Sequence, residues 1–253
     1  MRRRANASQL SSCSLREWEA EVVRTYNDDH VARRDLRLLR PVPPGKLSMA
    51  KLLKFWVNTQ LVNTVGRLLT AQFSHVRVFD SGLMQTMMHA GAKVSHPSVQ
   101  SMLKALLEEA PSQAEFFGEA RDPVHLWLYP WCNGNHWYFV CVDFRLERVL
   151  VIDSMGRKAE HTSAARAAQI LTQELFRLGK RAGAVQWSQW RFRSLEDATP
   201  QQSPGEVANC GVFMLAAMWC LARCVPIRTV RAEDMGRWRA RLALWACLGA
   251  VPA

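Results

Sequence analysis

The feature of this sequence that most constrains its fold is a change of hydrophobic period near residue 125. Four short segments rich in aromatic and β-branched residues follow, separated by polar residues that favour turns: 125–129, 136–142, 149–152 and 185–190. Such segments are typical of neighbouring strands of one sheet. Between the last two, residues 161–178 carry apolar side chains at helical spacing, which predicts a helix that covers one face of the sheet.

The rest of the chain shows helical periodicity. Residues 81–90 and 97–109 have apolar residues three and four positions apart, and Pro97 stands where the first turn of a helix tolerates proline. Further helices are predicted at 15–26, at 210–223 and at 230–247, and residues 48–69 are predicted to form one or two helices with Ser48 available as N-cap. The order of these elements predicts an α+β fold with a central, mostly antiparallel sheet flanked by helices.

Length and proline placement favour one large domain behind an N-terminal extension. The chain has 253 residues, more than the usual ~150-residue domain but not enough for two domains of ordinary size. Residues 1–45 are basic and end in RPVPPG, whose prolines cannot continue a helix. We therefore expect a basic extension with a proline-rich linker at 1–45 and a folded domain at 46–253.

Charge and cysteine content limit the classes of partner and compartment. With 33 basic and 22 acidic residues the formal net charge is +11, which favours acidic partners in general. Nucleic-acid binding is not expected, because the basic runs lack interleaved aromatic residues or a reader motif. Seven scattered cysteines argue against a disulfide framework. Since no secretory signal or long apolar stretch is present, we expect a nuclear or cytoplasmic protein without a membrane partner.

Four residues follow one another in the order that a thiol hydrolase needs. Cys210 opens a predicted helix, whose unpaired N–H groups lower the pKa of a thiol. The resulting thiolate needs a basic partner that a carboxylate orients. His136, at the head of a predicted strand, and Asp153, at the end of the next, fit these roles. Gln202 precedes Cys210 by eight residues and can supply an oxyanion donor beside the Cys210 N–H.

The spacing of His136 and Asp153 favours contact between them. Segments 136–142 and 149–152 can pair as an antiparallel hairpin that turns near residues 145–147. Both side chains would then emerge at the same end of the sheet. The chemistry of this set needs no metal and no organic cofactor.

Three segments, LYPWCNGNHWYFVCVDF, VLVIDSMGR and PQQSPGEVANCGVFM, resemble the catalytic core of the Ulp/SENP cysteine proteases, which process SUMO and related ubiquitin-like modifiers. The resemblance extends from about residue 75 to about residue 225. It implies a papain-like fold, a modifier and its conjugates as partners, and hydrolysis after the modifier's C-terminal Gly-Gly. It also implies roles for five residues: His136 as base, Asp153 as its orienting group, Gln202 as oxyanion donor, Cys210 as nucleophile and Trp137 over the substrate diglycine.

The sequence differs from the family pattern at three places. Seven residues, where the family usually has five, separate Gln202 from Cys210. Asn209 stands where the family has Asp before the nucleophile. Upstream, VRVFDSGLMQTMM resembles the family's Trp-Leu-Asn-Asp segment only around Asp80, which places Arg77 at the position of a substrate-clamping tryptophan.

Two other classes fit the same residues. Related viral or transposon-type processing proteases and acyltransferases use a similar order of His, acid and Cys, so the product can be a matured polypeptide or an acetylated protein. The chain can also be an inactive relative that uses its groove or its charged surface for binding. Intact Cys210, His136 and Asp153 favour an enzyme over the binding protein.

Overall fold

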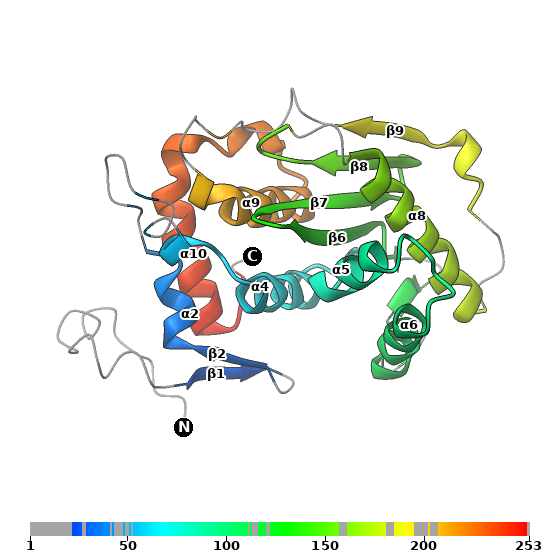
Figure 1. Ribbon diagram of the computed structural model, residues 1–253, viewed down its shortest axis with the longest axis horizontal. Coiled ribbons are helices and arrows are strands. Elements are labelled where there is room, and N and C mark those ends of the chain that lie inside the picture. Colours follow the sequence, from blue (N-terminus) through cyan, green and yellow to red (C-terminus); the bar gives the residue numbers. More distant parts are fainter. Residues whose placement is uncertain are drawn as a thin grey trace.

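A five-stranded sheet in the order β3-β6-β7-β8-β9 forms the centre of the molecule (Figure 1). The three central strands are antiparallel, as predicted, whereas the edge strands β3 and β9 each run parallel to their neighbour. The strands are β3 (Val76–Val78), β6 (Leu126–Asn133), β7 (His136–Asp143), β8 (Arg148–Ile152) and β9 (Arg191–Ser194). The computed structural model describes residues 22–26, 29–40, 42, 48, 51, 53–110, 112, 116–119, 122–156, 161–180, 185–194, 202 and 207–251.

Helices cover both faces of the sheet. Every residue of the central strand β7 is therefore buried. Its side chains alternate between two cores: Trp137 and Phe139 lie in one core, while Tyr138 and Val140 lie in the other. The first core is shared with α4 (Thr59–Gln72), α9 (Cys210–Ala222) and α10 (Met235–Leu248), and the second with α5 (Ser81–His89), α6 (Pro97–Glu109) and α8 (His161–Leu178).

Two of the predicted helices have the expected bounds. Both α6 and α8 match their predicted ranges, with Pro97 in the first turn of α6. The predicted region 48–69 contains more than one helical segment. Lys51 is helical, and the longer helix α4 begins at Thr59, where the Asn58 side chain caps it by accepting from the Leu61 N–H at 3.0 Å. Shorter elements complete the fold: η2 (Leu53–Phe55), β4 (Gly118–Glu119), β5 (Asp122–Pro123), η5 (Val207–Asn209), η6 (Ile227–Thr229) and η7 (Ala232–Asp234).

Two predicted elements are wrong. The segment 185–190 is not a strand: it contains η4 (Trp187–Gln189), and β9 begins only at Arg191. The single helical turn brings Trp187 and Trp190, three residues apart, into edge contact with ring centroids 4.7 Å apart. Part of the predicted helix 15–26 is also a strand, since β1 (Val22–Tyr26) pairs with β2 (Asp29–Ala32), while residues 15–21 lie outside the described part.

Residues before position 46 contribute to the core. The short helix α2 (Arg33–Arg37) follows β2, and Leu36 and Leu39 are buried in the same core as α4 and α9. The Asn58 side chain also donates to Asp35 at 2.8 Å, which joins this region to the start of α4. Residues 22–40 are therefore packed against the domain, and most of the proline-rich segment after them lies outside the described residues. Within the described part, no helix has the length and hydropathy that a membrane crossing requires.

Because α4 packs closely on β3, one added methyl group should change the stability of the protein strongly. A Cβ at Gly66 would lie 2.8 Å from Cγ1 of Val78. Gly66→Ala should therefore lower the free energy of unfolding by about 1–3 kcal/mol, although alanine favours a helix. Gly236→Ala in α10 is the matched control, since nothing lies within 4 Å of its added Cβ. Urea unfolding measures both, and equal stability of the two variants would contradict this packing.

Candidate active site

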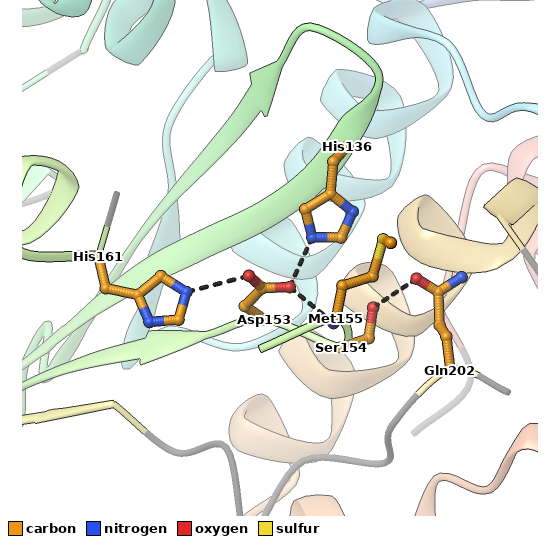
Figure 2. Close-up of polar contacts among 6 residues, drawn as sticks. All are labelled: His136, Asp153, Ser154, Met155, His161 and Gln202. Carbon is orange, nitrogen blue, oxygen red and sulfur yellow. Dashed lines mark hydrogen bonds and ion pairs between the residues drawn. The ribbon is translucent and has the colours of Figure 1, made fainter. Parts of the chain in front are cut away.

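The pairing of β7 with β8 brings His136 and Asp153 together as predicted. Phe139 pairs with Ile152 in the antiparallel register, so His136 begins β7 at the edge where Asp153 follows β8. Nε2 of His136 lies 2.5 Å from Oδ1 of Asp153 (Figure 2). Both residues are 1% exposed, so water does not compete for this hydrogen bond.

The Asp153 carboxylate accepts further hydrogen bonds. The backbone N–H of Met155 donates to Oδ1 at 2.8 Å, and Nε2 of the buried His161 donates to Oδ2 at 3.0 Å (Figure 2). Burial alone would raise the pKa of Asp153, but the hydrogen bonds from His136 and His161 hold it well below its usual range. The carboxylate therefore stays ionised and orients His136.

His161 was not predicted for this site. It opens α8, eight residues after Asp153, and its ring reaches back from the helix to the carboxylate. A histidine at a helix start carries no signal in the sequence that distinguishes this contact from ordinary burial. Only the close approach of α8 to the end of β8 reveals it.

His136 is held in a state that favours its charged form. Burial lowers the pKa of His136, but hydrogen bonds to Asp153 and to the thiol of Cys210 outweigh it and raise the pKa to about 9. Because Nε2 faces Asp153, Nδ1 is the ring nitrogen that remains for the thiol. The imidazole thus links the carboxylate and the cysteine.

Cys210 is the first residue of α9, where the unpaired N–H groups of the first turn lie. The following residue has to be small: a Cβ at Gly211 would lie 2.8 Å from Cβ of Val57 and 3.2 Å from Cδ1 of Trp137. Glycine therefore lets the start of α9 approach the edge of the sheet that carries His136. The structure thus brings together three predicted residues, Cys210, His136 and Asp153.

Gln202 lies beside the residue that follows Asp153. Its backbone N–H donates to the carbonyl of Ser154 at 2.9 Å, and the Ser154 hydroxyl donates to Oε1 of Gln202 at 3.1 Å (Figure 2). These contacts orient the side-chain amide, with its oxygen toward Ser154 and its NH₂ group directed away. Gln201 lies outside the described residues.

Trp137 is more deeply buried than its predicted role suggests. Its ring is in the core, 4% of the residue is exposed, and Nε1 donates to the carbonyl of Val57 at 2.8 Å. This bond brings the segment around half-buried Trp56 next to Trp137 and Gly211. The signal in the sequence for Trp56 was an aromatic residue two positions before Asn58, the cap of α4.

Arg77 does not lie at the site, so its predicted position is wrong. It pairs with Trp127 near the start of β6, whereas His136 pairs with Asn133 at the other end of that strand. Its Nε donates to the carbonyl of Phe116 at 2.9 Å, and its guanidinium lies over the Phe116 ring, 4.2 Å from the centroid. The similarity around Asp80 misled because the aspartate caps α5 and has no part in the site.

Comparisons with known proteins agree with this geometry. A family model, "Ulp1 protease family, C-terminal catalytic domain", matches residues 75–246. Solved structures of similar fold include the Ulp1 protease domain in complex with Smt3, the yeast ortholog of SUMO: TM-score 0.69 and 14% identity, covering 97% of this chain and 93% of that chain. The Chaetomium thermophilum Ulp1-like SUMO protease catalytic domain has a TM-score of 0.63 and 20% identity, with 93% and 85% covered.

A third solved structure, Ulp1 with its catalytic cysteine oxidised to a sulfenic acid, has a TM-score of 0.66 and 14% identity, covering 91% of this chain and 89% of that chain. Comparison with curated proteins gives no match. The structural similarities confirm the predicted α+β, papain-like fold. Since the family match spans residues 75–246, well over half of the 253 residues, the chain belongs to the Ulp1 protease family.

Proposed function

We propose that this protein is a cysteine protease that hydrolyses the bond after the C-terminal glycine of a SUMO-type modifier. The observation that carries the proposal is the buried His136, which joins Asp153 on one side and Cys210 on the other. Family membership and the SUMO proteases among the structures of similar fold support the substrate class. The six described cysteines form no disulfide, which supports action in the nucleus or cytoplasm.

In the proposed reaction the Cys210 thiolate attacks the carbonyl carbon of the modifier's last glycine. The carbonyl electron pair moves to oxygen, and the bond to the lysine amine breaks as imidazolium His136 gives that nitrogen its proton. Neutral His136 then removes a proton from water, which attacks the thioester. The modifier leaves as a carboxylate, and the thiolate and imidazolium pair is restored. Asp153 stays ionised throughout and stabilises the charged imidazole.

Two further residues are assigned to substrate binding in this proposal. Gln202 donates its side-chain amide, together with the N–H of Cys210, to the oxyanion. Trp137 and the neighbouring Trp56 form one side of the passage for the Gly-Gly tail, which is thin enough to pass a large indole. In this proposal residues 1–45 remain the basic N-terminal extension, and its segment 22–40 packs against the catalytic domain.

Loss of the nucleophile should abolish turnover without unfolding the protein. Cys210→Ala has no attacking atom, and Cys210→Ser offers a hydroxyl that remains protonated beside a histidine suited to a thiol. Release of SUMO from a SUMO–lysine isopeptide conjugate measures the rate. Cys220→Ala, in the same helix and also buried, is the matched control and should keep most of the activity. Hydrolysis by Cys210→Ala would contradict the assignment.

The pKa of His136 sets the alkaline limit of turnover. Hydrogen bonds hold this pKa at about 9, so the rate should fall as pH rises through that value and the imidazolium loses its proton. Asp153→Asn removes the charge that favours imidazolium, while burial still disfavours it. The alkaline limb should therefore move to lower pH by about one unit or more, and kcat should drop on the order of 10²-fold or more. A pH profile with the same alkaline limb in the variant would remove Asp153 from this role.

Gln202 should affect the rate more than the affinity. Gln202→Ala should lower kcat by about 10²- to 10³-fold with little change in KM, since the amide engages the oxyanion of the tetrahedral state. Ser154→Ala, which only loosens the orientation of the amide, should have a smaller effect. Steady-state kinetics compare both with Gln201→Ala. If Gln201→Ala is the more damaging variant, the oxyanion donor is the neighbouring glutamine.

A further inference from the structure

A buried arginine lies beneath the start of the nucleophile helix. Arg239 of α10 is 1% exposed, and all five of its N–H groups are used. Nε and Nη2 donate to Oδ1 of Asn209 at 3.0 and 2.8 Å, and Nη2 also donates to the carbonyl of Ala208 at 2.8 Å. Nη1 donates to the carbonyls of Phe55, at 3.0 Å, and Leu38.

Every one of these acceptors is neutral. The guanidinium therefore has no N–H left for a carboxylate, and the described residues include no ion pair of Arg239 within 4.0 Å. A buried charge is usually paired, because removing it from water is costly. Here carbonyl dipoles replace the counter-ion, so within the described part of the chain the positive charge remains uncompensated at short range.

The charge lies close to Cys210. Asn209 directly precedes the nucleophile, and its side chain, which makes no capping hydrogen bond to α9, is turned to Arg239 instead. Burial lowers the pKa of Arg239 to about 10, while the charge of Cys210 raises it. Arg239 is thus charged at neutral pH and interacts electrostatically with the thiolate.

We propose that Arg239 is a positioning residue that stabilises the Cys210 thiolate through its uncompensated charge and fixes Asn209 at the entrance of α9. This proposal rests on the proposed role of Cys210 as nucleophile. The family has an aspartate at position 209, which would neutralise this guanidinium. In this chain Asn209 accepts the hydrogen bonds of Arg239 but carries no negative charge.

Among the described residues, the other titratable groups that interact with Cys210 lie on the sheet or directly behind it. His136 on β7 supplies the second positive charge, with the ionised Asp153 behind it. Burial raises the pKa of Cys132 on β6 to about 11, helped by the charge of Cys210, so that thiol is neutral at pH 7. Arg239 therefore provides the cationic contribution from the helical side of the thiolate, and His136 provides it from the strand side.

The test places a carboxylate at position 209, where it would pair with Arg239. Asn209→Asp keeps the size and hydrogen bonds of the side chain and pairs the guanidinium. In the full chain, the rate of Cys210 alkylation by iodoacetamide is followed against pH by peptide mass spectrometry. Asn209→Asp should raise the pH midpoint of alkylation and slow alkylation below that midpoint by roughly tenfold. An unchanged or lowered midpoint would overturn the proposal.

Further variants distinguish the effect of the Arg239 charge on Cys210 from effects of other charges. Gln169→Glu, on α8 across the sheet, adds the same charge far from the site and should leave the midpoint unchanged. Glu206→Gln should also leave it unchanged; a lowered midpoint would show that this carboxylate already neutralises Arg239. Arg239→Lys should keep a lower midpoint than Arg239→Gln, and equal midpoints would contradict a role for the charge.

Alkylation requires no modifier, so this result is independent of the substrate. A raised midpoint in Asn209→Asp supports the electrostatic role of Arg239 even if the protein fails to cleave a SUMO conjugate, an outcome that overturns only the proposed function. Cleavage of SUMO with an unchanged midpoint in Asn209→Asp overturns only the role of Arg239.

Discussion

The hydrogen bond between His136 and Asp153 depends on the register of two adjacent strands. In the β7–β8 hairpin Phe139 pairs with Ile152, and both strands are buried by helices on their two faces. A shift of one residue would turn every side chain of β7 to the opposite core, so the register is strongly specified. The same burial that fixes the hairpin excludes water that would compete for the hydrogen bonds of the pair. Burial by itself disfavours both charges, and the hydrogen bonds outweigh it, so that Asp153 stays ionised and His136 protonated.

The nucleophile is held at that edge by contacts between distant segments. Gly211 lets α9 approach Val57 and Trp137, and Arg239 connects the entrance of α9 to the carbonyls of Leu38 and Phe55. Helix α10 and the region before residue 46 thus support the site although neither carries a proposed catalytic residue. In our proposal the positive charge of Arg239, on α10, and that of His136, on β7, both act on the Cys210 thiol, an arrangement suited to a stable thiolate.

Much of this arrangement follows from local patterns. The period change, the hairpin and the bounds of α6 and α8 were predictable because a stripe, a proline at a first turn or a compact turn specifies each of them. Similar patterns misled where one sequence signal fits two structures. Trp187 and Trp190 suggested a strand but lie in and directly after η4, and the aspartate near Arg77 suggested a site residue but caps α5. His161 and Arg239 were missed because their contacts join residues that no local rule relates: Arg239 bonds to Leu38, 201 positions away.

The central claim is that Cys210 attacks the C-terminal carbonyl of a SUMO-type modifier. A SUMO derivative with an electrophile in place of its last carboxylate tests it most directly, because attack becomes a permanent bond whose position can be mapped. Intact mass and peptide mapping should show one modifier per chain, attached at Cys210, and much slower labelling by a ubiquitin electrophile. Attachment at another cysteine, equal labelling by ubiquitin, or no labelling of a folded protein would contradict the account.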